Sequence, residues 1–335
     1  MVRVVQQVIE KYNLCQKKTI PKLKKTTQGQ ELFAKLAKYR VVEGSITDNI
    51  PVTKVNDHSC YQVQFFATTL DDLTHIDVLI QQVSATEVGQ YFCFSAPRYI
   101  ALSQLKCAHN PTQAITCNES IWQPYINRIN SRYLGVVVPK GGANVHSGIL
   151  YLDSNDDINV FKHELLHLLG FVDEYPLPNN HTFCQQVSPT PTAHNVAALL
   201  PFYRGIKEEV RKKVLTKISW AHLIKPSTPI LFAVDDKWQV GTPVQFNKSV
   251  GVFPVNTCEN SKVFAVKPIS QHSPLAYFDL MLPALYQQLL QTNSDRYLMP
   301  SFHYNIASAL EKKGDKVNAL LWRNKAISHS KESVD

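Results

Sequence analysis

The sequence predicts an α/β (α+β) fold in which a mixed, twisted sheet packs against helices. Strand-like alternation and short apolar runs recur between residues 41 and 152. A helix-periodic segment at 121–129 separates two of these runs, and a longer one follows at 158–169. With 335 residues, the chain is long enough for two domains or for one domain with additions.

Residues 1–90 are expected to form an N-terminal helix and a small β-containing region. Met1–Lys25 is typical of a basic amphipathic helix. The alternation in Tyr61–Phe66 predicts a strand, and the apolar run Ile76–Ile80 falls in the same strand-like stretch.

Residues 91–285 are expected to form the catalytic domain. Its predicted elements are strands at Tyr91–Phe94 and Tyr99–Leu102, a helix at Ile121–Ile129, strands at Tyr133–Val138 and Ser147–Leu152, the motif helix described below, a basic helix near Lys207–Lys217, and strands at Ile230–Val234 and Val244–Phe246. Strands interspersed with helices in this order favour a mixed sheet.

Residues 286–335 are expected to form a helical C-terminal extension. The small and apolar positions around Gly314 fit one helical hairpin of tetratricopeptide type, with Arg323 where an aromatic residue is usual and Trp322 beside it. Such repeats need neighbours for stability, and the sequence has one copy. A packed terminal hairpin is therefore favoured over a repeat array.

The net charge of +8 is spread along the chain, and its densest basic stretches lack interleaved aromatic residues. Solvated helix faces are the favoured explanation, a preference for an acidic surface or substrate is the alternative, and no nucleic-acid partner is expected. No apolar run approaches the roughly 18–20 residues that span a bilayer, so no membrane span is expected either.

The seven cysteines form no CxxC pair. Cys107 and Cys117 bracket a loop short enough for a disulfide, and Cys184 could pair with Cys258. Disulfides would favour a secreted or periplasmic protein. Since the N-terminal residues do not have the pattern of a signal peptide, such a protein would have had its leader removed. Buried free thiols and a cytoplasmic location are the alternative.

The motif helix has a start signal and a stop signal. Ser154 with Asp157 three residues on predicts a capping-box variant. A core stripe follows, and Gly170 predicts a left-handed helix end.

His163-Glu-Leu-Leu-His167 lies within that helix. Histidines at i and i+4 face the same way and can bind one zinc ion. Glu164, between them, is expected to act as the general base on the metal-activated water.

The pattern continues through Gly170 to Asp173, which is expected to be the third ligand. Three protein ligands leave one position open, as in catalytic zinc sites, so one Zn²⁺ per chain is expected. Glu174 is the alternative third ligand. His181, Tyr175 and His146 could approach the site, although exposure or simple packing is the commoner role for such residues.

The pattern HExxHxxGxxD resembles the metzincin signature, with an aspartate third ligand as in the snapalysin family. The longer run His163–Tyr175, ending in Asp-Glu-Tyr, is more similar to the IgA-cleaving metallopeptidase family. This resemblance implies a metzincin-like catalytic domain, an edge strand at Gly148–Leu152 that binds extended substrate, and a methionine turn. Met281 is the preferred methionine for that turn, and a core methionine is the alternative.

These observations predict a zinc-dependent endopeptidase that acts on a protein or peptide substrate. The rival hypothesis is a catalytically inactive protein that keeps the zinc site and the fold for binding or interaction, although such a protein would not need Glu164. A third reading treats the motif as an ordinary core helix, and it leaves Gly170 and Asp173 as coincidences.

Overall fold

The computed structural model describes residues 27–39, 60–108, 113–178, 180–259 and 261–331. The amphipathic helix expected at Met1–Lys25 therefore lies outside the described residues. The chain divides into two compact units, of which the first comprises Met1–Glu164 with Pro300–Asp335 and the second Leu165–Met299. This division differs from the expected boundaries at residues 90 and 285. Each unit is described by itself.

The first unit is built on a five-stranded mixed sheet. The order of its strands is β2 (Phe92–Tyr99), β1 (Tyr61–Ala67), β3 (Tyr133–Val138), β5 (Ile149–Asp153) and β4 (Asn144–His146). Neighbouring strands are parallel except for β4, which pairs antiparallel with β5. The predicted mixed sheet is confirmed. β1 comes from the segment expected to form a separate region, yet it lies between β2 and β3.

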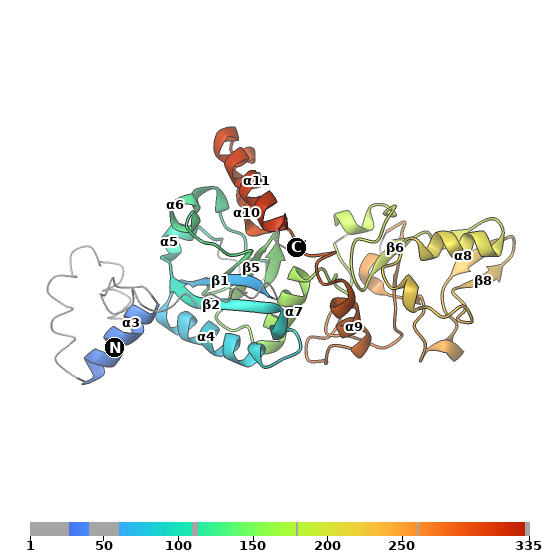
Figure 1. The fold of residues 1–335 in the computed structure, drawn as a ribbon, viewed down its shortest axis with the longest axis horizontal. Coiled ribbons are helices and arrows are strands. Elements are labelled where there is room, and N and C mark those ends of the chain that lie inside the picture. The colour runs from blue at the N-terminus through green and yellow to red at the C-terminus, as the bar shows by residue number, and fades with distance from the viewer. Residues whose placement is uncertain (1–26, 40–59, 109–112, 179, 260, 332–335) are drawn as a thin grey trace. The chain divides into compact units, whose positions relative to one another are not determined.

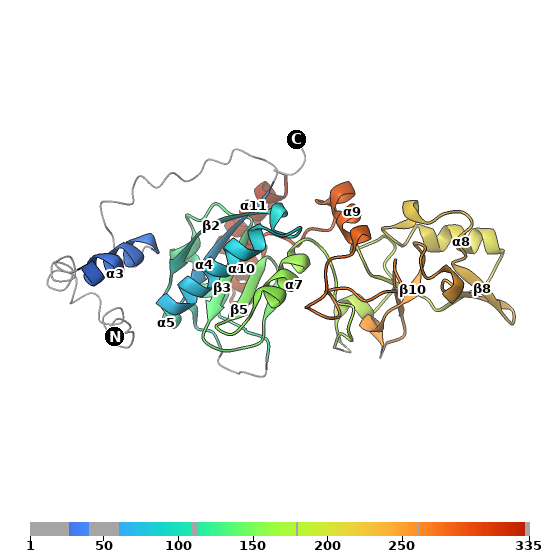
Figure 2. The ribbon, with the colours of Figure 1, turned by 90° about the horizontal axis from the view of Figure 1, so that it is seen from below.

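Helices cover both faces of this sheet (Figures 1 and 2). One face carries α4 (Leu70–Ser84) and α7 (Ile158–Leu168), and the other carries α5 (Leu102–Leu105), α6 (Gln123–Ile126), α10 (Phe302–Lys312) and α11 (Lys316–Lys331). Because side chains alternate along a strand, Phe65 packs edge-on against Phe161 of α7, at 5.5 Å between ring centroids. Phe66 joins the core on the opposite face.

The strand-like interpretation of Ile76–Ile80 is wrong, because this run lies inside α4. The helix starts where the side chain of Thr69 accepts a hydrogen bond from the Asp72 amide at 3.0 Å. Leu73, Ile76 and Val83 are buried at helical spacing. A short apolar run fits a strand or a buried helix equally well, and here the cap decides for a helix.

The C-terminal helices form the packed hairpin that the sequence favoured. Gly314, with φ of +87°, makes the turn between α10 and α11. Ile306, Leu310 and Trp322 join the same core cluster as Val136 of β3. The aromatic residue that α11 buries is Trp322, one position before Arg323, which occupies the place where the repeat usually has an aromatic residue.

The expectation that Gly148–Leu152 is an edge strand is also wrong. β5 pairs with β3 on one side and with β4 on the other. Its backbone groups on both sides are therefore engaged within the sheet. The edge next to it is the short strand β4.

The second unit contains two small antiparallel sheets. They consist of β10 (Phe253–Pro254), β11 (Phe264–Lys267) and β6 (Ala197–Leu199), and of β7 (Phe202–Tyr203), β9 (Lys237–Val240) and β8 (Leu231–Val234). The predicted basic helix is α8 (Lys207–Leu215), and a further helix is α9 (Ala284–Asn293). Val244–Phe246 is a 3₁₀ turn rather than the predicted strand.

Three disulfides join described cysteines. The suggested pairs Cys107–Cys117 and Cys184–Cys258 are present, and Cys60–Cys93 was not foreseen. Cys15 lies outside the described residues. Three disulfides are compatible with an extracellular protein.

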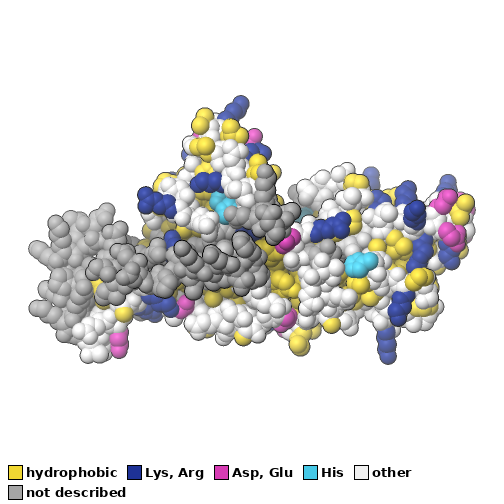
Figure 3. All heavy atoms as spheres, viewed as in Figure 1, with side chains coloured by type: hydrophobic (Ala, Val, Ile, Leu, Met, Phe, Trp, Pro, Cys, Tyr) yellow, Lys and Arg dark blue, Asp and Glu magenta, His cyan; other side chains and the backbone are white. Residues whose placement is uncertain are grey.

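Lys and Arg side chains are scattered over the face seen in Figure 3 rather than gathered in one patch. No helix in the described ranges combines the length and the apolar character that crossing a membrane requires.

Candidate metal centre

The motif helix α7 is capped by Asp157. Its Oδ1 atom accepts hydrogen bonds from the amides of Asn159 and Val160, at 2.8 and 3.1 Å. Ser154, the expected cap, instead donates its hydroxyl hydrogen to Oδ1 of Asp72 at 2.6 Å. Ser and Asp are both favoured at helix N-caps, and here Asp157, three residues after the expected cap, takes that role.

α7 ends where Gly170 adopts φ of +87°, as predicted. The amide of Gly170 donates to the carbonyl of His167 at 3.0 Å, and the amide of Phe171 donates to that of Leu166 at 3.1 Å. A Cβ at position 170 would overlap the backbone of Tyr297, so only glycine fits here. The chain then turns back toward the end of the helix.

This turn brings Asp173 to the two histidines of the helix. One potential ligand atom from each of His163, His167 and Asp173 lies within 4.8 Å of the others, so the group could hold a metal ion. The side chains of His167 and Asp173 are only 14% and 15% exposed, and His163 is buried. A site this poorly solvated favours ligation over loose ion pairing.

The hydrogen bond at Nδ1 of His167 determines which of its two ring nitrogens carries the hydrogen. Its Nδ1 lies 3.1 Å from the carbonyl oxygen of Phe171, which can only accept, so Nδ1 carries the hydrogen. In the neutral ring Nε2 is then a lone-pair atom, and it lies 3.2 Å from Oδ1 of Asp173. A metal ion bound between these two atoms would satisfy both lone pairs.

Glu164, the expected base, follows His163 on α7 and is 5% exposed. Its side chain is therefore shielded from solvent. Shielding strengthens its interaction with a neighbouring cation.

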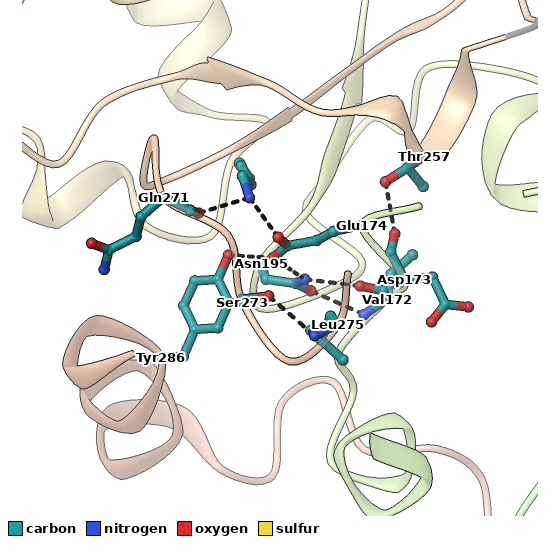
Figure 4. A network of polar contacts seen from close by, with 10 residues as sticks. Val172, Asp173, Glu174, Asn195, Thr257, Gln271, Ser273, Leu275 and Tyr286 are labelled. Carbon is teal, nitrogen blue, oxygen red and sulfur yellow. Dashed lines mark hydrogen bonds and ion pairs between the residues drawn. The ribbon is translucent and has the colours of Figure 1, made fainter. Parts of the chain in front are cut away.

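Glu174, the alternative ligand, points into a separate polar cluster (Figure 4). Its Oε2 atom accepts from Nζ of Lys267 at 2.6 Å. Its Oε1 atom accepts from the hydroxyl of Tyr286 at 2.5 Å and from Nδ2 of Asn195 at 3.2 Å. Burial and the Glu174 carboxylate raise the pKa of Tyr286 well above its usual value. Glu174 is thus occupied as a structural anion, and the metal-competent group contains Asp173 instead.

The backbone that carries Asp173 is held at three consecutive residues. Asn195 receives the amide hydrogen of Val172 at 2.9 Å and donates to its carbonyl at 2.8 Å. The Thr257 hydroxyl donates to the carbonyl of Asp173 at 2.7 Å, and the amide of Glu174 donates to the carbonyl of Leu275 at 2.9 Å. These bonds fix the backbone on either side of the Asp173 side chain.

The remaining candidates are exposed to solvent. His181 is exposed and accepts a hydrogen bond from the Phe183 amide, and Tyr175 is 37% exposed. His146 is an exposed residue of β4. Met281 is 81% exposed, so it is neither the buried methionine of a turn beneath a metal nor a core residue.

Sequence reasoning missed Lys267, Tyr286, Asn195 and Thr257. The sequence did contain one indication of Lys267: a glutamate buried beside a candidate metal ligand, as Glu174 is, needs a cationic partner. Nothing in the spacing indicated which of the many lysines supplies it.

His194 was also missed. It is buried against Phe171 and Tyr297, with ring centroids at 5.2 and 4.8 Å, and burial lowers its pKa to about 4. It is therefore a neutral packing residue at neutral pH.

In comparisons with known proteins, no protein-family model matches this chain, and no curated protein matches it at a significant level.

Proposed function

We propose that the protein is a zinc-dependent endopeptidase whose metal is held by His163, His167 and Asp173. The observation that carries the proposal is the 3.2 Å approach of two lone-pair atoms, Nε2 of His167 and Oδ1 of Asp173, with His163 beside them. Two imidazoles and one carboxylate are a donor set that suits zinc, and three ligands leave a coordination position for substrate or water.

A zinc ion bound there would polarise the scissile carbonyl and lower the pKa of a coordinated water toward about 7. The chain supplies the remaining roles. Glu164 would accept a proton from the attacking water and deliver it to the leaving amine. Its position next to His163 in the sequence and its burial support this role.

His167 is prepared for ligation by its bond to the Phe171 carbonyl, which leaves Nε2 unprotonated. The backbone of Asp173 is held in place by a hydrogen bond from Thr257 to its carbonyl. The backbones of its neighbours Val172 and Glu174 are hydrogen-bonded as well. The likeness of the motif to the IgA-cleaving metallopeptidases supports peptide-bond hydrolysis, and the three disulfides support a secreted or periplasmic location.

Digestion of a peptide library tests the proposal. Wild-type protein should cleave peptides, a chelator should stop cleavage, and added zinc should restore it. Glu164→Gln should retain zinc but lose at least about 100-fold in kcat/KM, because general-base catalysis contributes about that much. Zinc binding without cleavage in the wild type would instead support the non-catalytic alternative.

A further inference from the structure

A shallow pocket of about 250 Å³ lies in the first unit, and none of the residues of the candidate metal centre lines it. One wall is the turn at 127–130, directly after α6, and the other is formed by α10 and α11. The polar lining residues are Asn127, Arg128, Asn130, His303, Lys325 and His329.

The lining is cationic. Arg128 and Lys325 carry permanent charges, two histidines and two carboxamides add hydrogen-bonding groups, and no carboxylate lines the pocket. Arg128 is exposed and forms no ion pair with any residue that the structure describes. Its charge is therefore available to a ligand.

His303 sits in this pocket with an unmet hydrogen-bonding need. It is 2% exposed and stacks between Phe302 and His329, with ring centroids at 4.0 and 4.4 Å. Its Nδ1 atom is buried and makes no hydrogen bond within the described part of the chain. Such an atom calls for an explanation, and a bound ion or water is a common one.

The electrostatic setting of His303 supports an anion rather than a cation as the missing partner. Burial, together with the neighbouring His329 and Lys325, lowers the pKa of His303 from 6.5 to about 3. The ring thus lies in a positive potential. Figure 3 shows histidine beside Lys and Arg side chains on the part of this unit that carries the hairpin.

The pocket walls are joined by hydrogen bonds. Nζ of Lys325 donates to the carbonyl of Asn127 at 3.2 Å, and Nη1 of Arg132 donates to that of His329 at 2.6 Å. A site already tied together loses little conformational freedom when it binds a ligand.

We propose that this pocket binds a small oxyanion group, either a phosphate or a carboxylate, with Arg128 and Lys325 as its charge partners and the imidazole of His303 as a ring donor. Charge-assisted bonds of this kind are the strong ones in anion recognition. The proposal does not depend on the peptidase activity.

The test is an NMR titration of the full chain with inorganic phosphate and, separately, with acetate, at constant ionic strength set by sodium chloride. The ring Cε1–H signals of His303 and His329 are followed, after assignment with His303→Gln and His329→Gln. Saturable shifts of these signals are expected. In Arg128→Gln/Lys325→Gln the affinity should fall about tenfold or more.

The matched control is Lys312→Gln/Lys313→Gln, which removes two charges from the exposed end of α10. It should change the affinity less than about twofold, because salt screens distant charges. Saturation by one anion alone supports the proposal and identifies the group. If neither anion gives saturable shifts, or if both double variants lower the anion affinity equally, the proposal is wrong. Thermal melts verify that each variant is folded.

Discussion

Nε2 of His167 lies 3.2 Å from Oδ1 of Asp173, across the turn that Gly170 opens. The carbonyl of Phe171 holds the ring hydrogen on Nδ1, so the two facing atoms are both acceptors when the ring is neutral. Three features adjoin this pair: the turn at Gly170, the buried cluster around Glu174, and the ring of His194, which packs against Phe171. Each of these features leads to a prediction.

The turn can be tested by replacing its glycine. Gly170→Ala should destabilise the protein by several kcal/mol, because left-handed backbone costs a non-glycine residue about 1–2 kcal/mol and the Cβ would also overlap Tyr297. Gly314→Ala is a matched control, since Gly314 has the same φ of +87° and no atom near the site of a Cβ. It should cost only about 1 kcal/mol. Urea denaturation of both variants measures the difference, and equal losses would contradict the steric argument.

Removal of one partner of the buried Lys267–Glu174 pair should strongly destabilise the protein. Lys267→Met leaves a buried carboxylate without its cation, and such a loss typically costs about 3–5 kcal/mol. Lys267→Met/Glu174→Gln should recover part of that loss because no buried charge remains. Arg204→Met breaks the exposed pair with Asp236 and should cost about 1 kcal/mol or less. Chemical denaturation compares the three, and a similar cost for both single variants would argue against a buried charge.

His194 should make stability depend on pH. Its pKa is lowered from 6.5 to about 4 by burial, so the unfolded chain binds the proton first as pH falls. The stability that His194 contributes is complete above pH 6.5 and is lost as pH falls toward 4. Between pH 7.5 and 5 this loss amounts to at most about 2 kcal/mol. His194→Phe keeps a packed ring and should lose correspondingly less over that interval, as denaturation at the two pH values would show. An unchanged pH dependence would mean that His194 titrates alike in both states.

The identity of the third ligand can be tested by comparing neighbours. Asp173→Ala should weaken zinc binding by about 100-fold or more, since it removes a ligand rather than an outer partner. Glu174→Gln keeps an acceptor for Lys267 and Tyr286, so a smaller loss of affinity is expected. Competition with a zinc chelator measures both affinities. The reverse order would move the ligand role to Glu174.

The sequence was informative where local geometry determines the outcome. The spacing of His163 and His167 follows from the helix, and Gly170 follows from the need for a positive φ. β1, β3 and β5 were predicted for the same reason, because alternation and apolar runs are local signals.

Features set by distant partners were not predictable. Two partners of Glu174, Lys267 and Tyr286, come from β11 and α9, and no motif connects them to Asp173. The position of β4 beside β5 is a property of the sheet rather than of either segment. The exposure of Met281 likewise depends on what packs around it.

The most direct test of the central claim is the zinc content of the purified protein, measured by elemental analysis after zinc supplementation and removal of excess metal. Wild-type protein should contain about one zinc per chain, as a three-ligand site predicts. His163→Ala/His167→Ala should contain almost none while remaining folded. A wild-type value near zero, or equal zinc in the double variant, would contradict the assignment of His163, His167 and Asp173 as a metal centre.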